Sequence, residues 1–135
     1  MGYTKCAIEE RGRIEKMEKD LERYLSATPI IDSDHKSVRD YAFETMDASR
    51  EPVERSMKLY LAVRDNILYD PYSPFYLPKH YRASYVLKRG RSFCVPKASL
   101  LCALGRASGI PSRVGFADVR NHLATKQLLD FIGSD

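Results

Sequence analysis

Apolar and polar positions alternate along this chain with a period close to that of an α-helix, and they predict a mostly helical protein. Over about residues 10–25, apolar side chains recur every three or four positions, with Glu, Lys and Arg between them. This spacing predicts an amphipathic helix with one core-facing stripe and one solvated face. Pro29 ends the helix, because proline moves the residue before it, Thr28, toward extended geometry. The apolar stripe consists of Ile14, Met17, Leu21, Tyr24 and Leu25.

The next two expected helices begin at residues that suit a helix start. Asp34 can cap a helix over about residues 35–47. Pro52 is favourable in a first turn, and the pattern after it predicts a helix that continues to about Tyr69. From Asp70 to Pro78 there are three prolines and several aromatic residues, which indicates an ordered, extended loop packed by its own rings. The apolar residues at helical spacing in the third helix are Val53, Met57, Tyr60, Leu61, Ile67 and Leu68.

Glycines mark the expected helix ends in the second half of the chain. A short helix over about residues 82–88 should end at Gly90. A further helix starts at Cys94, because Pro96 is tolerated only in a first turn, and Gly109 supplies its left-handed C-terminal cap. Apolar residues surround the axis of this helix, so it should be central and buried.

One short strand and one more helix complete the expected elements. Ser112 to Phe116 have the pattern of a strand. Asn121 can cap a last helix that reaches about Ile132. The chain as a whole is therefore expected to be mostly α-helical, with one or two short strands.

Composition indicates a single soluble globular domain. The chain has 135 residues, enough for one domain and too few for two, and 30% of them are charged and 44% hydrophobic. No apolar run approaches the roughly 20 residues of a membrane span. Glu9 and Glu10 stand where a secretory signal would place its apolar stretch. We therefore expect a cytoplasmic protein with no membrane partner.

Charge is distributed unevenly along the chain. The formal net charge is +4, yet Pro71 to Ala117 contain eight Lys and Arg residues and no Asp or Glu. Residues 79–97 combine basic side chains with Tyr81, Tyr85 and Phe93, a pattern that could bind phosphates and stack on bases. The same positive potential would stabilise a thiolate or attract another anion, or the residues could form plain solvated surface. We rank nucleic-acid binding last among these interpretations.

The three cysteines favour neither a disulfide framework nor a metal site. Cys6, Cys94 and Cys102 form an odd set without CxxC or Cys/His ligand spacing. Cys94 and Cys102 would lie about 12 Å apart on one helix, too far to form a disulfide. We expect free thiols in a reducing compartment, a core position for Cys102, and no metal or other cofactor.

Cys94 has the sequence surroundings of an activated nucleophile. Gly90 provides a turn shortly before it, and the helix start brings unpaired backbone N–H groups and the positive end of the macrodipole to the sulfur. Both favour thiolate over thiol, and Lys97 adds a positive charge nearby. The sequence therefore predicts a thiol nucleophile at Cys94.

These residues resemble the core signature of the transglutaminase-like superfamily, which has a papain-like cysteine fold. The resemblance rests on Gly90 to Ala98 and on Arg106 to Phe116, which reads RASGIPSRVGF. Val63 to Tyr69 are similar to the helix that commonly precedes this core in bacterial members. We expect one such domain over residues 1–135, with a helical N-terminal extension over 1–59 and the core with its nucleophile helix over 60–135.

The resemblance implies an α+β fold and a Cys-His-Asp mechanism. A thiolate attacks an amide or ester carbonyl of a protein or peptide, a histidine on a following strand exchanges the proton, and an acid on the next strand orients that histidine. Cys94 matches the nucleophile, and its own backbone N–H is a candidate oxyanion donor. The family's histidine and acid follow the segment that ends here, so we expect a domain that is incomplete at its C-terminus and inactive alone. Loss of those strands would expose a sheet edge beside Ser112 to Phe116 and favour self-association.

His122 is the histidine downstream of Cys94, which makes it the candidate base within this chain. It falls at an expected helix start rather than on a strand, so closing a helical turn or lying at the surface is the favoured interpretation. Asp118 could orient His122 or cap local backbone. His35 and His80 precede the cysteine, and structural or solvated roles are favoured for both.

Three hypotheses from different classes remain. The first is a cysteine acyl-transfer or amide-hydrolysing enzyme, a peptidase or amidase, represented here by an incomplete domain. The second is a catalytically silent module that binds a protein partner through its helices and basic surface. The third is nucleic-acid binding through residues 79–97.

Overall fold

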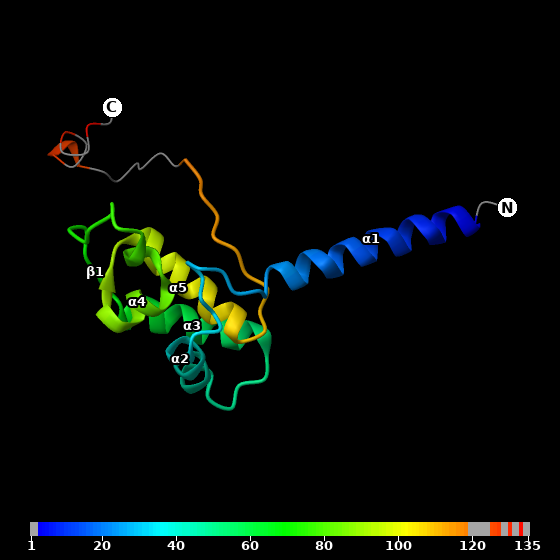
Figure 1. Cartoon of the computed structure of the whole chain (residues 1–135), viewed down its shortest axis with the longest axis horizontal. Helices are drawn as coiled ribbons and strands as arrows, with labels where there is room; N and C mark the ends of the chain where they lie inside the picture. Colours follow the sequence, from blue (N-terminus) through cyan, green and yellow to red (C-terminus); the bar gives the residue numbers. More distant parts are fainter. Residues whose placement is uncertain (1–2, 119–124, 128–129, 131–132, 134–135) are drawn as a thin grey trace.

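The computed structural model describes residues 3–118, 125–127, 130 and 133, and this part of the chain is mostly helical with two short strands (Figure 1). This agrees with the fold class expected from the sequence. In chain order, the elements are α1 (Tyr3–Arg23), α2 (Lys36–Met46), α3 (Pro52–Asn66), β1 (Leu68–Tyr69), the 3-10 helix η1 (Pro78–Tyr81), α4 (Ala83–Arg89), β2 (Arg91–Ser92) and α5 (Cys94–Ala107).

Helix α5 lies at the centre of the hydrophobic core, and α2, α3 and α4 pack around it (Figure 1). Leu100, Ala103 and Leu104 of α5 are completely buried, which confirms the central position expected for this helix. Each buried leucine contributes about 2 kcal/mol of transfer free energy. The surrounding elements contribute Val38 and Ala42 of α2, Leu59 and Val63 of α3, Ile67, and Ala83 and Val86 of α4.

Two short parallel strands hold the end of α3 beside the start of α5. Leu68 pairs with Arg91 and Tyr69 with Ser92. The amide of Leu68 donates to the Gly90 carbonyl at 2.9 Å, and the amide of Asp70 donates to the Ser92 carbonyl at 2.9 Å. Because β2 leads directly into α5, this pairing sets where that helix begins.

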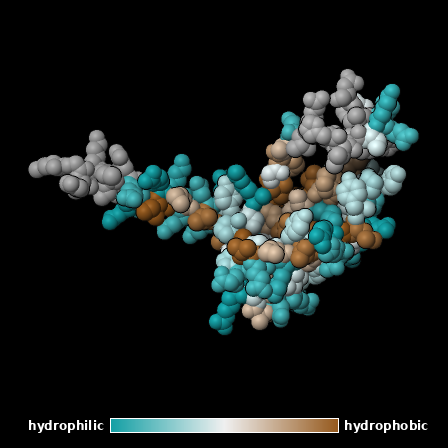
Figure 2. Space-filling model, turned by 180° about the vertical axis from the view of Figure 1, so that it is seen from behind, coloured by the Kyte–Doolittle hydropathy of each residue, from teal (hydrophilic) through white to brown (hydrophobic). Residues whose placement is uncertain are grey.

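Helix α1 extends away from the helices around α5 as a single helix (Figure 1). Its C-terminal end is joined to the remainder of the protein. The amide of Ser112 donates to the Tyr24 carbonyl at 3.0 Å, and the Arg106 guanidinium donates to the Ser26 carbonyl at 2.6 Å. The apolar stripe expected to face a core is instead exposed, with Ile14 at 50%, Met17 at 58% and Leu21 at 48%. In Figure 2, apolar side chains on α1 are visible with no other segment over them.

Two expectations for α3 are wrong. The helix ends at Asn66 rather than near Tyr69, because the next residues form β1. Its buried face consists of Leu59 and Val63, with Ile67 just after the helix. The apolar residues at helical spacing are largely exposed, since the face that packs into the core is centred on Leu59 and Val63 instead. The exposed members are Val53, Met57, Tyr60, Leu61 and Leu68.

Other differences concern helix caps and the expected strand. The N-cap of α2 is His35, whose side chain accepts from the Ser37 amide, so the assignment of Asp34 as the cap is wrong. Ser112 to Phe116 form no strand in the described structure, and the sheet edge expected beside them is therefore not present there. Self-association itself stays a prediction. The last helix expected, from Asn121 onward, falls largely outside the described residues.

Within the described residues, no helix has both the length and the apolar character required to cross a lipid bilayer.

Candidate active site

A glycine turn and a short strand bring Cys94 to the first position of α5. Gly90 ends α4 with a φ of +65°, a left-handed conformation that glycine adopts without steric cost. Ser92 of β2 is buried, and Phe93 serves as the N-cap in extended geometry. The ring of Phe93 makes an edge contact with Tyr81, with 5.6 Å between centroids. The predicted start of this helix is therefore correct, and its position is held by packing on both sides of the turn.

The Cys94 thiol is exposed, whereas the helix that carries it is buried. The Phe93 side chain makes no capping hydrogen bond, and its carbonyl accepts from the Lys97 amide at 3.2 Å. Backbone N–H groups in a first turn have no partner within their own helix, and the macrodipole is positive there. The sulfur thus lies beside backbone N–H groups that are placed to donate to an oxyanion.

A groove between α3 and α5 opens beside Cys94. Its volume is about 320 Å³, and it is mainly apolar. Tyr60 and Tyr69 provide exposed rings along one side, so a substrate chain could lie against them. The lining residues are Tyr60, Val63, Arg64, Tyr69, Cys94, Lys97, Ala98 and Leu101.

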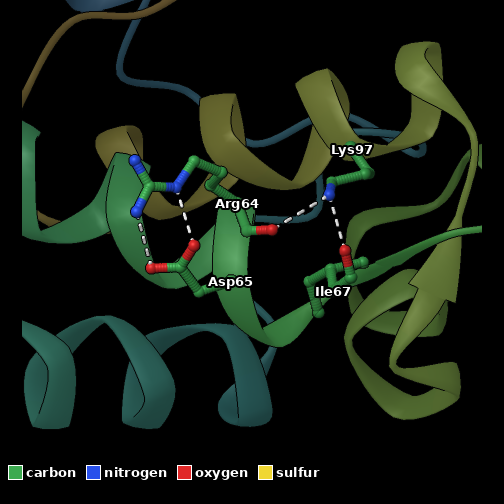
Figure 3. Close-up of polar contacts among 4 residues, drawn as sticks. All are labelled: Arg64, Asp65, Ile67 and Lys97. Carbon is green, nitrogen blue, oxygen red and sulfur yellow. Dashed lines mark hydrogen bonds and ion pairs between the residues drawn. The ribbon is translucent and has the colours of Figure 1, made fainter.

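Lys97 fastens α5 to the C-terminal end of α3 (Figure 3). Its Nζ donates to the Ile67 carbonyl at 2.5 Å and lies 3.5 Å from the Arg64 carbonyl. Arg64 itself pairs with Asp65 at 2.7 Å. A cation is favourable at a helix C-terminus, where backbone carbonyls lack partners. Lys97 therefore lines the groove with Cys94, as expected of a nearby positive charge, and also has a structural role that sequence reasoning missed.

A larger apolar cavity lies against the other side of the start of α5. Its volume is about 620 Å³, and Val95 and Ser99 of α5 contribute to its wall. The aromatic loop expected between Asp70 and Pro78 forms part of this wall with Phe75 and Tyr76. Their rings make an edge contact with 5.9 Å between centroids, although both side chains remain exposed.

The other two cysteines differ from Cys94. Cys102 is 5% exposed, and burial raises the pKa of its thiol, partly offset by the nearby Arg106. The position agrees with the expected core role and does not suit a nucleophile. Cys6 falls within α1, and its side chain is outside the described part of the structure.

The described histidines lie away from the Cys94 groove. His35 caps α2 at the surface, and His80 is buried, with its Nδ1 2.8 Å from the Arg89 guanidinium. Neither is among the residues that line the groove. Asp118 is exposed in a segment without regular secondary structure, and His122 lies outside the described residues. The structure therefore does not bring a described histidine or Asp118 together with Cys94 in this groove.

Half of the basic residues in the segment without acidic residues form internal ion pairs or hydrogen bonds, which the sequence pattern did not reveal. Arg82 pairs with the buried Asp32 at 3.1 Å, and Arg89 lies 3.7 Å from Asp70. Lys97 and Arg106 donate to backbone carbonyls. Asp32 also accepts from the Ser84 amide at 3.0 Å and so caps α4 across the core. The sequence signal for this buried carboxylate was weak, since Asp32 merely follows the apolar pair Ile30 and Ile31.

Among the residues that the structure describes, no group of three or more His, Cys, Asp and Glu side chains is arranged to hold a metal ion.

Comparison with known protein families identifies one match. A family model described as the transglutaminase-like superfamily matches residues 39–130, about two thirds of the chain. The match begins in α2 and includes α3, α4, the two strands and α5 with Cys94. Comparisons with curated proteins and with solved structures give no match. The order of elements around the exposed thiol and the extent of this match together establish that the chain belongs to the transglutaminase-like superfamily.

Proposed function

We propose that this domain serves thiol-dependent acyl transfer or amide hydrolysis, with Cys94 as the nucleophile. The observation that carries the proposal is the exposed thiol at the first position of a buried helix, beside a groove of about 320 Å³. Exposure gives a substrate access to the sulfur, while the buried helix holds the sulfur in place. Membership of the superfamily supports the same chemistry.

The proposed reaction develops negative charge on the carbonyl oxygen of the substrate. The Cys94 thiolate attacks the carbonyl carbon of an amide, and the oxyanion that forms is stabilised by backbone N–H groups at the helix start, including that of Cys94. The carbon–nitrogen bond then breaks, the nitrogen leaves with a proton, and a thioester remains on the sulfur. Water or an amine attacks this thioester and releases the acid or the new amide.

The groove favours a protein or peptide as the acyl donor. It is open at the surface and presents the rings of Tyr60 and Tyr69 next to Cys94. An extended peptide could place an apolar side chain against these rings while its amide reaches the sulfur.

Proton transfer requires a base beside the thiol. His35 and His80 do not line the groove, so His122, oriented by Asp118, is the candidate that this chain itself offers.

Thiol reactivity provides the first test. The reduced protein is treated with iodoacetamide at neutral pH, and alkylation of each cysteine is followed by peptide mass spectrometry. We expect Cys94 to react about tenfold faster than N-acetylcysteine amide in the same buffer, because a thiolate is the reactive species. The buried Cys102 should react much more slowly. A Cys94 rate equal to that of the reference thiol would contradict the proposal.

Two matched substitutions separate catalysis from stability. Cys94→Ala should abolish attachment of dansylcadaverine to casein, or any ammonia release from casein, with almost no change in the urea midpoint because the side chain is exposed. Cys102→Ala should lower the free energy of unfolding by about 1 kcal/mol because it leaves a small cavity, while the Cys94 alkylation rate stays the same. Activity that survives Cys94→Ala would overturn the assignment, as would equal catalytic loss in both variants.

Nucleic-acid binding is the weaker alternative. Arg82, Arg89 and Lys97 make internal contacts, which reduces the number of cations free to neutralise phosphates over residues 79–97. We expect no salt-dependent binding of a mixed-sequence oligonucleotide, measured by fluorescence anisotropy. Binding that weakens steeply with salt would restore this alternative.

A further inference from the structure

The exposed apolar face of α1 is a feature that the proposed chemistry does not use. Ile14, Met17 and Leu21 project from a helix that extends alone, and each is about half exposed. An amphipathic helix gains most of its stability in proteins from packing of its apolar face. The stripe therefore lacks the packing partner that normally stabilises such a helix.

The stripe has the spacing of a coiled-coil seam. Ile14 and Leu21 are seven residues apart, and Met17 lies between them three residues after Ile14. These are the a, d and a positions of a heptad repeat, and Glu10 occupies the preceding d position. The helix has 21 residues, or about 31 Å of length, which allows three heptads. Gly12, the residue least favourable in a helix interior, lies at an outward f position and so stays off the seam.

The charges that flank this seam are complementary to those of an antiparallel second copy. Arg11 and Glu18 occupy e positions, and Arg13 and Asp20 occupy g positions. When Ile14 of one copy faces Met17 of the other, Arg11 lies across from Glu18 and Arg13 lies across from Asp20. Two-fold symmetry repeats both pairs, so each of the four flanking contacts joins opposite charges.

A parallel pairing is less favourable. It would place Glu10 of each copy against the other inside the seam, which opposes two like charges in a site with little water. It would also leave Arg11 without an acidic residue opposite, since the facing position is Cys6. The antiparallel arrangement instead sets Glu10 beside Leu21 near the ends of the contact.

We propose that α1 is a dimerisation helix, which pairs with α1 of a second copy of this chain in an antiparallel two-stranded coiled coil. The joined end of each helix, at Tyr24 and Ser26, then lies at an opposite end of the pair. The body of each copy, meaning α2 to α5 with the two strands, then lies at its own end of the helix pair. The Cys94 grooves of both copies therefore stay open. The inference is independent of the proposed acyl-transfer activity, because it concerns none of the groove residues.

Sedimentation velocity of the whole reduced chain over about 5 to 500 µM tests the proposal, since a short helical pair is a small interface and should dissociate in this range. We expect a monomer–dimer equilibrium. Leu21→Asp should leave only monomer, because it places a charge in the seam of both copies, while the circular dichroism of the body and its urea midpoint stay the same.

Charge exchange tests the orientation. Arg11→Glu should weaken the dimer about tenfold, because two attractive contacts become repulsive. Addition of Glu18→Arg to Arg11→Glu should restore the affinity, since each copy then again offers opposite charges. Lys19→Glu is the matched control, because it makes the same change of charge at an outward f position and should leave the affinity within about twofold.

Several outcomes would overturn the proposal. A chain that is monomeric at about 500 µM has no dimerisation helix of this kind. Dimers that persist in Leu21→Asp use another surface, and an Arg11→Glu variant that dimerises normally excludes the antiparallel register. A monomer whose α1 binds vesicles of anionic phospholipid, and loses that binding in Leu21→Asp, would assign the stripe to a membrane surface instead.

Discussion

The two cysteines of α5 differ in accessibility because one is exposed and the other is buried. Cys94 and Cys102 share α5, yet one thiol is exposed at the helix start and the other lies among core side chains. Burial raises the pKa of Cys102 and keeps it protonated near neutral pH, although Arg106 acts in the opposite direction. The same helix therefore carries one thiol that is accessible for chemistry and one that serves packing.

His80 shows a comparable effect at a polar site. It is buried and accepts from Arg89, and Arg89 also donates to Ser73 at 3.2 Å. Burial lowers the pKa of His80, and the positive charges of Arg89 and Lys79 lower it further. Tyr85 packs against the ring with 5.1 Å between centroids. The folded protein thus favours the neutral form of this imidazole.

The lowered pKa of His80 predicts a loss of stability in mild acid. Above the unfolded-state pKa of about 6.5, the folded and unfolded chains both hold His80 neutral, and its contribution to folding is complete. As the pH falls below that value, the unfolded chain takes up the proton more readily, so stability decreases until the lowered folded pKa is passed. Urea midpoints between pH 8 and pH 5 should show this fall, and His80→Gln should flatten it. Identical pH profiles for the two proteins would exclude His80 as the cause.

At the scale of elements, the turn after α5 packs closely against the last turn of that helix. Arg106 donates to the Ser112 carbonyl at 2.9 Å, and the Ile110 amide donates to the Gly105 carbonyl at 2.8 Å. A Cβ on Gly105 would overlap the Ser112 hydroxyl and lie 3.4 Å from the Ser112 Cβ. A Cβ here would therefore displace the Ser112 hydroxyl, which donates to the Ile110 carbonyl at 2.7 Å.

Gly105→Ala should consequently destabilise the protein although alanine is the better helix former. We expect a loss of about 1 kcal/mol in the free energy of unfolding, because the clash outweighs the gain in helix propensity. Adding Ser112→Ala should recover most of the loss, since the overlapping oxygen is removed. Gly12→Ala is the matched control, because a Cβ there meets nothing within 4 Å, and it should not lower stability. Urea unfolding followed by circular dichroism measures all three, and a destabilised Gly12→Ala would contradict this explanation.

At the scale of the whole molecule, α1 and the body around α5 are nearly independent. The contacts that join them involve Tyr24 and Ser26 just after α1, Arg106 in the last turn of α5, and Ser112 and Arg113 after α5. The seam residues Ile14, Met17 and Leu21 of α1 are exposed and are not part of the hydrophobic core. The body should therefore fold without most of this helix.

Removal of residues 1–20 tests this independence. At low protein concentration, where dimers are few, the free energy of unfolding should change by less than about 0.5 kcal/mol, because no core contact is lost. Urea unfolding monitored by circular dichroism gives the value. A loss of several kcal/mol would show that α1 packs on the body in solution.

The sequence alone was sufficient where local stereochemistry decides the structure. Gly90, Pro96 and Gly109 determine where α5 begins and ends, and the apolar residues that surround its axis indicated its burial. The position of Cys94, and with it the superfamily, followed from this local information. The helical character of α1 through α4 was likewise visible in the spacing of apolar residues.

Tertiary structure decided which helix faces are buried and which distant segments pair with each other. Helix α3 has apolar residues on two faces, so its periodicity could not show that Leu59 and Val63, rather than Met57 and Tyr60, would be buried against α5. The pairing of Leu68 with Arg91, and the bond from Lys97 to the end of α3, join segments far apart in the chain. Local sequence patterns determine where each helix or strand begins and ends. Which face is buried, and against which partner, depends on the free energy of packing between elements, and that free energy arises only when the elements come into contact.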